Sequence, residues 1–338
     1  MSNLKITGRR VWKEIDRANN ILLHLHPGPD GDSLGSSLAF FHVLRKMRKT
    51  VTLISGDSPF PQKFQNVPGA KYVTQQNFTQ LDLSKFDLFI IHDSSSPTQV
   101  TRMGELKFPK NLKTIAIDHH ASNEKFADIN LVMPKYTSTA QVLYELFQLR
   151  KIKITKNIAA CLFIGVYTDT GAFRYFNPTY KTFDMASRLA KIYPKFSQLI
   201  FDIENNDHPD YLKFISLALS SIENHLNDHL AIASLSYQQI KDNKLDIDMI
   251  NNYSVVTNML KGVIGWDIAI TLVESKKGLV KVNFRTRDAK TFNVAKLAVA
   301  TGSGGGHPGA AGATLQKSLP EAKKYLIDLV KKLHPKLA

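Results

Sequence analysis

A seven-residue segment near the N-terminus brings one imidazole and two carboxylates close together. It reads HPGPDGD over residues 26–32, so it holds His26, Asp30 and Asp32. Carboxylate and imidazole are donors suited to Mn²⁺, Mg²⁺ or Fe²⁺, and the segment therefore predicts a metal site. The alternative is purely local: Asp32 or Ser33 caps a helix and Asp30 closes an Asx-turn. That alternative explains Asp30 alone better than it explains all three side chains together.

Two further clusters follow short apolar segments. Asp93 comes directly after DLFIIH, and Asp118, His119 and His120 come directly after TIAI. A turn or a helix cap is the ordinary explanation of the first cluster, and a solvated turn that of the second. Two adjacent histidines cannot point the same way, so one can bind a metal while the other faces a substrate or a carboxylate. A third cluster at a strand end makes the solvated turn less convincing.

Asp169 closes another apolar run, in the sequence YTDTG that ends at Gly171. The run predicts a helix, so Asp169 stands at a helix C-terminus, where a negative charge opposes the helix dipole. A bound cation would compensate for that unfavourable position. Asp169 is therefore a further candidate ligand.

Together these candidates exceed what one divalent ion needs. Four carboxylates facing one another repel, and their charge matches two divalent cations. Paired metal ions roughly 3.5–4 Å apart, bridged by a carboxylate, serve displacement at phosphorus by activating water and neutralising phosphoryl oxygens. The sequence thus predicts a dinuclear hydrolytic site, whose candidate ligands are His26, Asp30, Asp32, Asp93, His119 and Asp169.

The elements that must position these residues alternate between strand and helix in the first half of the chain. Short apolar runs predict strands, and segments with apolar residues at helical spacing predict helices. This alternation is typical of an α/β domain with a doubly wound, mostly parallel sheet, in which ligands bind at the carboxyl edge. The predicted strands cover residues 21–26, 51–54, 87–92 and 114–117, and the predicted helices cover 33–47, 137–148, 158–168 and 180–192.

The pattern changes after residue 192. Two prolines and the polar run ENND predict a linker over residues 193–211. We therefore expect a catalytic domain over 1–192 and a smaller α+β domain over 212–338, with the active-site cleft between them. The predicted helices of the second domain are 212–225, 247–260 and 319–333, its strands are 230–236, 266–274 and 279–284, and a glycine-rich loop covers 302–312.

Composition limits the classes of function. The chain has 338 residues, about twice the usual size of one domain, so two domains are expected. Its formal net charge of +15 favours a polyanionic partner such as nucleic acid, nucleotides or anionic lipid. A single cysteine, Cys161, excludes an internal disulfide and a cysteine-built metal site. No run is apolar enough to span a bilayer and no secretory signal is visible, so we expect a cytoplasmic protein without membrane contact.

The four clusters in the first half closely resemble the motifs of the DHH phosphoesterase family. They are HPGPDGD, the lone Asp93 after an apolar strand, DHH at 118–120 and TDTG at 168–171. Two later segments resemble the domain that accompanies this family: GGGHPGAAG at 304–312 resembles its glycine-rich motif, and NFR at 283–285 resembles its substrate-binding arginine segment. The motifs stand in the family's order over nearly the whole chain.

The resemblance assigns a role to each matching residue. It implies two divalent ions, with Mn²⁺ expected and Mg²⁺ or another divalent ion as the alternative. Asp93 would bridge the two ions, His120 would contact the scissile phosphate, and Asp118 would orient the histidines. One ion would be held by His26, Asp30 and Asp93, and the other by Asp32, Asp93, His119 and Asp169.

The glycine-rich segment would bind substrate. Glycines 304–306 let a backbone approach a ligand closely and offer N–H groups to an anion, although a glycine run alone is usually a flexible loop. His307 within it and Arg285 nearby strengthen the assignment. Arg174 and Arg287 are better explained as solvated surface charges. The candidate substrate-binding residues are thus Arg285, Gly304, Gly305, Gly306 and His307.

Within this family the chain resembles the compact two-domain group of nanoRNases, pAp phosphatases and linear-dinucleotide phosphodiesterases. No oligonucleotide-binding or sensory domain is visible beside the two expected domains. The resemblance implies hydrolysis of short RNA or dinucleotides such as pApA, and of the 3′-phosphate of pAp, and it is compatible with a homodimer. Two alternatives remain: a non-catalytic regulator that binds nucleotides, and a basic protein or exonuclease that acts on long single strands.

Overall fold

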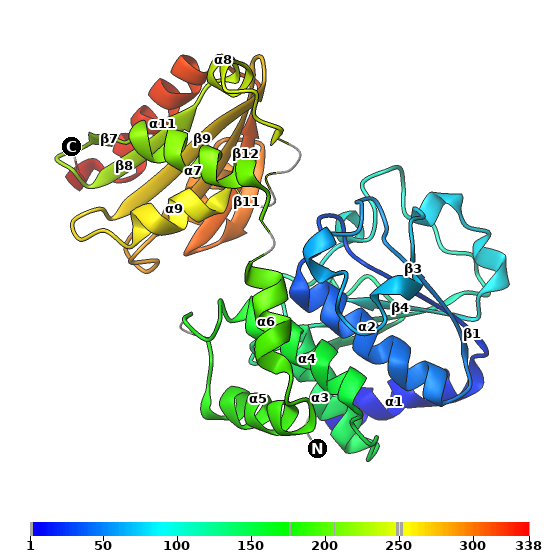
Figure 1. Cartoon of the computed structure of the whole chain (residues 1–338). Helices are drawn as coiled ribbons and strands as arrows, with labels where there is room; N and C mark the ends of the chain where they lie inside the picture. The colour runs from blue at the N-terminus through cyan, green and yellow to red at the C-terminus, as the bar shows by residue number, and fades with distance from the viewer. Residues whose placement is uncertain (1–2, 176, 206, 248–249, 251–252, 338) are drawn as a thin grey trace. The chain divides into compact units, whose positions relative to one another are not determined.

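The computed structural model describes residues 3–175, 177–205, 207–247, 250 and 253–337. The chain divides into two compact units, residues 1–206 and 207–338 (Figure 1). Each unit contains one six-stranded sheet with its own hydrophobic core. The α/β fold class and the smaller second unit predicted from the sequence are confirmed.

The sheet of the first unit is parallel throughout, in the order β3-β2-β1-β4-β5-β6. Strand order reverses between the neighbours β1 and β4, and ligands of such open sheets bind at this switch point, beyond the carboxyl ends of the strands. The central strands are apolar on both faces because both are covered. The strands are β1 (Asn20–His24), β2 (Thr50–Ile54), β3 (Val73–Thr74), β4 (Leu88–His92), β5 (Lys113–Asp118) and β6 (Ile129–Val132).

Helices cover one face of this sheet, and their buried side chains form its main core. The other face is covered by irregular segments and short 3₁₀ turns, packed over Phe78, Phe89 and Leu112. The helices are α1 (Asn3–Arg17), α2 (Gly31–Lys46), α3 (Thr139–Leu149), α4 (Lys156–Asp169), α5 (Tyr180–Ile192) and α6 (Phe196–Glu204), and the 3₁₀ turns are η1 (Gln62–Phe64), η2 (Ala70–Tyr72), η3 (Phe78–Gln80), η4 (Leu83–Lys85) and η5 (Pro97–Gln99).

Two glycines let α2 and α4 approach each other closely. A Cβ on Gly35 would lie 2.4 Å from the carbonyl oxygen of Cys161, and a Cβ on Gly165 would lie 2.8 Å from Oδ1 of Asp32. Both distances are far below van der Waals contact, so neither position accepts a larger residue without movement. The close packing brings the C-terminal end of α4, which ends at Asp169, toward the start of α2.

The second unit has a mixed sheet in the order β11-β12-β10-β9-β8-β7, in which only β8 and β9 pair in parallel. Separate clusters of buried side chains pack on its two faces. Its strands are β7 (Glu223–His225), β8 (Leu230–Leu235), β9 (Ile268–Lys276), β10 (Leu279–Thr286), β11 (Gly304–His307) and β12 (Ala310–Leu315), and its helices are α7 (Pro209–Ser220), α8 (Tyr237–Asp242), α9 (Ser254–Lys261), α10 (Val294–Ala300), α11 (Leu319–Leu333) and the 3₁₀ turn η7 (Pro335–Leu337).

Several predicted elements differ from the structure. The expected linker over 193–211 contains α6, which belongs to the first unit because Leu199 and Ile203 are buried in its core. The helix predicted over 212–225 begins earlier, at Pro209, a residue well suited to the first helical turn. It ends at Ser220, and β7 follows. Residues 248–249 and 251–252 of the helix predicted over 247–260 lie outside the described residues, and α9 begins at Ser254.

The glycine-rich segment predicted as a loop forms strand β11, a two-residue turn and strand β12. The sequence interpretation also missed α1, a strongly amphipathic helix whose side chains Val11, Trp12 and Ile15 are buried. Among the described residues, no helix has both the length and the apolar character needed to cross a membrane.

Candidate metal centre

The predicted ligands meet at the switch point of the parallel sheet. His26 lies two residues after β1, and Asp93 follows β4 immediately. Asp30 is the N-cap of α2, where its Oδ1 accepts hydrogen bonds from the backbone N–H groups of Asp32 and Ser33, both at 3.0 Å. The local alternative placed the cap at Asp32 or Ser33 and gave Asp30 an Asx-turn, whereas in the structure Asp30 itself is the cap. The capping role also fixes the direction in which this carboxylate points.

His26, Asp30 and Asp93 form the first group of potential ligands. His26 Nε2 lies 3.7 Å from Asp30 Oδ1 and 3.5 Å from Asp93 Oδ2. Its other ring nitrogen, Nδ1, lies 3.3 Å from the carbonyl oxygen of Pro27. A hydrogen bond from Nδ1–H to that carbonyl leaves Nε2 as the free donor atom, the tautomer in which a histidine binds a metal through Nε2.

Asp32, His119 and Asp169 form the second group. His119 Nε2 lies 3.3 Å from Asp169 Oδ2, and His119 Nδ1 lies 3.3 Å from the carbonyl oxygen of Tyr136. His119 Nε2 and Asp169 Oδ2 are both buried and have no hydrogen-bond partner among the described residues. Buried polar atoms without partners are costly and call for an explanation such as a bound ion.

Asp93 lies between the two groups. Its Oδ2 is nearest His26, while its Oδ1 is 3.7 Å from His119 Nε2 and accepts a hydrogen bond from Thr139 Oγ1 at 3.1 Å. The residue is buried and its backbone is left-handed, with φ of 54°. That conformation is strained for most residues and tolerated by Asp and Asn. The backbone is thus held in an unusual conformation at the point where the two groups meet.

Asp118 orients the histidine pair. Its Oδ1 accepts hydrogen bonds from the backbone N–H of His119 at 2.7 Å and from Nδ1 of His120 at 2.8 Å. Its Oδ2 accepts a hydrogen bond from Asn123 Nδ2 at 2.7 Å. This buried carboxylate therefore holds the ring of His120 and the backbone of His119, and Asn123 holds the carboxylate. His120 Nδ1 lies 3.6 Å from Asp93 Oδ1, so its ring is placed beside the ligands.

The aspartates of the centre place more negative charge in a buried space than the surrounding groups stabilise. Burial raises the pKa of Asp32 and of Asp169 well above the usual value, and the neighbouring aspartates raise both further. Burial lowers the pKa of His26, but hydrogen bonds to Asp30 and Asp93 outweigh it and raise that pKa well above normal. The same competition, led by Asp118 on the raising side, places the pKa of His120 at about 9.

These features fit divalent cations. Without cations, the centre balances its carboxylates by taking up protons. The raised pKa values of Asp32 and Asp169 are consistent with this uptake. A cation would stabilise the ionised carboxylates and give His119 Nε2 and Asp169 Oδ2 the partner they lack. The donor set of carboxylate oxygens and imidazole nitrogens suits Mn²⁺, Mg²⁺ or Fe²⁺.

The sequence interpretation predicted a helix here but missed the contact between the N-terminus of α3 and the carboxylate of Asp32. The backbone N–H groups of Thr139 and Ala140 donate to the two oxygens of Asp32, at 2.6 and 2.9 Å, and the hydroxyl of Thr139 donates to Asp93. A helix N-terminus favours a carboxylate in this position. The available signal was Ser138 as an N-cap immediately before an apolar helical pattern, which locates the helix start and says nothing of Asp32.

Three of the predicted substrate-binding residues, Arg285, Gly305 and His307, lie on one face of the second unit's sheet. Arg285 on β10 and His307 on β11 both pair with Ala310 on the intervening strand β12. Residues directly opposite in antiparallel strands point to the same face, so Arg285 and His307 flank Ala310 about 10 Å apart, two strand spacings. Arg285 Nε donates to Asn258 Oδ1 at 3.0 Å, which fixes the guanidinium beside α9.

The three glycines of β11 differ in what a side chain would meet, and Gly304 and Gly306 face the side of the sheet opposite to Gly305. A Cβ on Gly304 or Gly306 would lie 2.5–2.6 Å from the nearest backbone atom, and Gly306 has φ of 142°. Those two positions are glycine for structural reasons. Gly305 is different, because a Cβ there would meet nothing within 4 Å. Gly305 pairs with Gly312, one step along the same face from His307, and leaves an open, shallow surface beside that side chain.

Comparison with known proteins agrees with this geometry. The family model for the DHH family, N-terminal domain, matches residues 20–166, and the model for the DHHA1 domain matches residues 234–333. The chain therefore carries a DHH domain followed by a DHHA1 domain.

Two relatives match this chain over almost the whole of their own length. The bifunctional oligoribonuclease and PAP phosphatase NrnA of Thermus thermophilus is 27% identical over 92% of this chain and 89% of its own. The protein of the same name from Bacillus subtilis is 24% identical over 94% of this chain and 96% of its own. The crystal structure of an exopolyphosphatase-related protein from Bacteroides fragilis, 22% identical, matches the fold with a TM-score of 0.88 over 98% of this chain and 97% of that one.

Proposed function

We propose that the protein is a dinuclear-metal-dependent phosphoesterase that hydrolyses short oligoribonucleotides and dinucleotides, and removes the 3′-phosphate of pAp. The observation that carries the proposal is that Asp93 belongs to two groups of potential metal ligands that meet at the switch point of the sheet, one with His26 and one with His119. The substrate class follows the names of relatives that match over nearly the entire chain.

The two groups divide the ligands between two ions. His26, Asp30 and Asp93 would hold one ion, and a second group would share Asp93 with it. When bound, the ions would supply an activated water and neutralise the phosphoryl oxygens. We expect Mn²⁺, with Mg²⁺ as the alternative. The second ion would be held by Asp32, Asp93, His119 and Asp169.

The chain's own residues position the reacting phosphate. Against the opposing effect of burial, Asp118 and Asp93 raise the pKa of His120 to about 9, which favours its protonated form. With Nδ1 held by Asp118, His120 would donate to a phosphoryl oxygen through its other ring nitrogen. His120 would therefore stabilise charge that develops on the phosphate in the transition state, and Asp118 is the residue that orients it.

The DHHA1 domain would bind the rest of the substrate. Arg285 would pair with a phosphate, His307 would donate to it or to a base, and the surface at Gly305 would let the ligand lie close to the backbone. Both side chains lie on one sheet face, at a spacing suited to a short anionic ligand. This assignment gives the second domain a role in capture and leaves the metals to the first.

A substrate panel tests the proposal. Purified protein is stripped with EDTA, reloaded with Mn²⁺ or Mg²⁺, and assayed on pAp, pApA, other dinucleotides and short RNA. We expect turnover that EDTA abolishes and Mn²⁺ restores, together with about two bound ions per chain by elemental analysis. Tight nucleotide binding without turnover in any metal would instead support a nucleotide-binding regulator. Faster cleavage of long strands than of dinucleotides would support the exonuclease alternative.

A further inference from the structure

Helix α1 carries a regular row of cations that the proposed reaction does not use. Lys5, Arg9, Lys13 and Arg17 recur at every fourth residue, and all four side chains are exposed. Four residues advance an α-helix by about 6 Å and slightly more than one turn. The four side chains therefore form one slowly winding row about 18 Å long, which we call the α1 band.

Acidic side chains neutralise only one end of the α1 band. Nη1 of Arg17 lies 3.6 Å from Oε1 of Glu14, so these two side chains form an ion pair. Across the described part of the chain, no carboxylate lies within ion-pair distance of Lys5, Arg9 or Lys13. Like charges four residues apart destabilise a helix. The row thus persists in spite of a cost that an anionic partner would remove.

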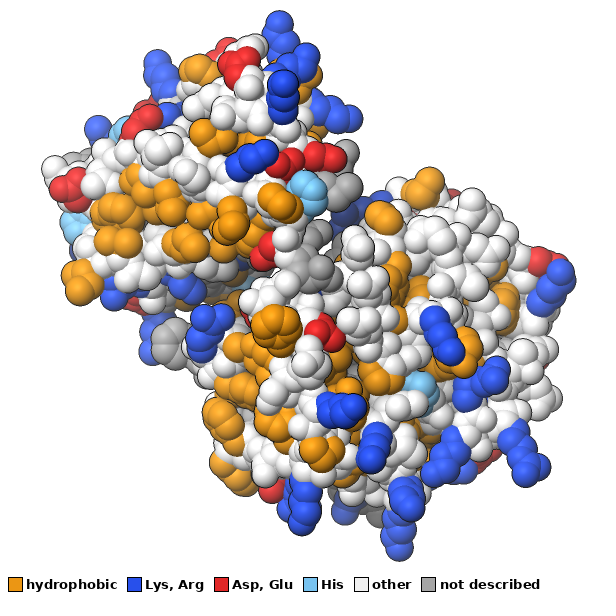
Figure 2. Space-filling view, viewed as in Figure 1, with side chains coloured by type: hydrophobic (Ala, Val, Ile, Leu, Met, Phe, Trp, Pro, Cys, Tyr) orange, Lys and Arg blue, Asp and Glu red, His pale blue; other side chains and the backbone are white. Residues whose placement is uncertain are grey.

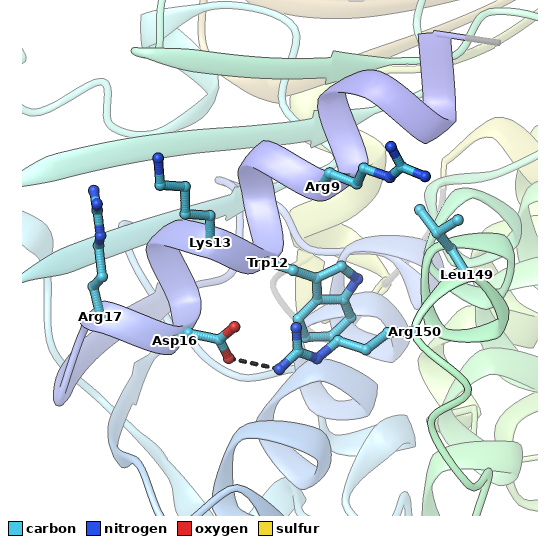
Figure 3. Close-up of a pocket in the computed structure, with 7 residues that line it drawn as sticks. All are labelled: Arg9, Trp12, Lys13, Asp16, Arg17, Leu149 and Arg150. Carbon is cyan, nitrogen blue, oxygen red and sulfur yellow. Dashed lines mark hydrogen bonds and ion pairs between the residues drawn. The ribbon is translucent and has the colours of Figure 1, made fainter. Parts of the chain in front are cut away.

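A cavity of about 460 Å³ opens beside the α1 band. Figure 3 shows Arg9, Lys13 and Arg17 projecting from successive turns of α1, with Arg150 lying across the ring of Trp12. The guanidinium of Arg150 is 5.1 Å from that ring's centroid and pairs with Asp16 at 2.7 Å. These two contacts hold Arg150 in place, so one wall of the cavity is a fixed Arg150–Asp16 ion pair, and the cations Arg9, Lys13 and Arg17 line the rest.

This surface is separate from the metal centre. The N-terminal end of α3 binds Asp32 through Thr139, whereas Arg150 follows the C-terminal end of the same helix. Eleven residues make α3 about 16 Å long. Further cations lie near the cavity, since Lys49 Nζ donates to the carbonyl oxygens of Asp16 and Ala18 at the end of α1. Figure 2 shows many Lys and Arg side chains, and few acidic ones, along the lower edge of this unit.

The shape and surroundings of the α1 band favour nucleic acid over lipid. A helix that lies on a membrane inserts an apolar face beside its cations, but the apolar side chains Val11, Trp12 and Ile15 are buried in the core. A slowly winding row of cations, each slightly more than one helical turn from the next, suits a flexible polyanion with regularly spaced phosphates. We propose that the α1 band is a second, non-catalytic surface that binds the phosphate backbone of single-stranded RNA longer than the substrate.

The test compares charge reversal on the α1 band with the same charge change elsewhere. The variant is Arg9→Glu with Lys13→Glu, and the control is Lys331→Glu with Lys332→Glu, two exposed residues on α11. Binding of full-length protein to a labelled single-stranded RNA of about 24 nucleotides is followed by anisotropy in EDTA over a range of salt concentrations. A milder pair, Arg9→Gln with Lys13→Gln, covers the case in which the first variant does not fold.

We expect the α1 variant to weaken binding at low salt by about tenfold or more, and to reduce the slope of log K against log salt by about 1.4 for two lost contacts to a single strand. The control should change binding by no more than about twofold, and turnover of a dinucleotide with Mn²⁺ should be equal in all proteins. Equal loss in variant and control would overturn the proposal. Unchanged RNA binding by the α1 variant would also overturn it. A variant that keeps RNA binding and loses only its binding to anionic vesicles would do the same. Wild-type protein that binds RNA but hydrolyses no dinucleotide would refute the proposed function and leave this inference standing.

Discussion

Replacing Asp93 tests whether one carboxylate serves both metal positions. Asp93→Asn keeps the size of the side chain and removes its charge, and Asn tolerates the left-handed backbone found here. Asp93→Ala would add backbone strain of roughly 1–2 kcal/mol and would mix folding with chemistry. The amide substitution is therefore the cleaner experiment.

The expected magnitude follows from the position of Asp93 between the two ligand groups. Loss of a residue that only orients a metal ligand costs about 10–100-fold in affinity or activity. A ligand shared by both ions should cost more, so we expect kcat to fall by at least about 1,000-fold, or roughly 4 kcal/mol of barrier. Asp30→Asn should cost less, because Asp30 touches only one group and Asn still caps α2.

The assay measures bound Mn²⁺ and pApA turnover on the same samples, with thermal unfolding as the check on folding. Asp328→Asn is the matched control, since Asp328 is exposed on α11 in the other unit. We expect Asp93→Asn to lose metal content and turnover together while its Tm, measured without added metal, stays close to wild type. Activity within about tenfold of wild type would refute the bridging role.

Three further predictions follow from the same centre. Gly165→Ala should reduce turnover and lower stability by roughly 1–3 kcal/mol, because its Cβ would press on the carboxylate of Asp32; unchanged Tm and kcat would contradict this packing. The folded-state pKa values of Asp32 and Asp169 lie above the usual 3.8. Metal-free protein should therefore lose stability as the pH rises through these two pKa values. The gain in Tm on adding Mn²⁺ should accordingly be larger at about pH 8 than at about pH 5. Arg285→Ala and His307→Ala should raise KM for pApA and leave bound Mn²⁺ unchanged; loss of metal in either variant would place that residue in the metal centre instead.

The candidate ligands could be selected from the sequence because each lies beside a recognisable strand end or at one end of a helix, and their role as metal ligands stays a prediction. Apolar runs such as LFIIH before Asp93 locate a buried parallel strand, and the carboxyl ends of such strands share one edge. No feature of the sequence indicated the left-handed backbone at Asp93. It depends on how β4 leaves the sheet, which is a tertiary property.

The parts that the sequence did not predict depend on contacts between distant segments. The N–H groups of Thr139 and Ala140 bind Asp32, more than 100 residues away, and backbone groups carry no residue-specific signal. Helix α6 was taken as part of a linker because prolines and polar residues surround it, whereas burial of Leu199 and Ile203 decides its place. The run of glycines resembled a loop, since a strand without side chains lacks the alternation by which strands are found.

Four of the five aspartates around the histidines divide into two pairs by the direction of their pKa shifts. Hydrogen bonds from neighbouring groups lower the pKa of the exposed Asp30 to about 2, and they lower the pKa of Asp118 in spite of its burial. These two carboxylates stay ionised and hold α2 and the histidine pair in position with or without metal. Burial and mutual repulsion raise the pKa of Asp32 and Asp169 instead, so a cation would stabilise their negative charge beyond what the N–H groups of Thr139 and Ala140 give to Asp32. The fold thus fixes the geometry of the centre through the first pair and leaves the second pair to respond to the metal.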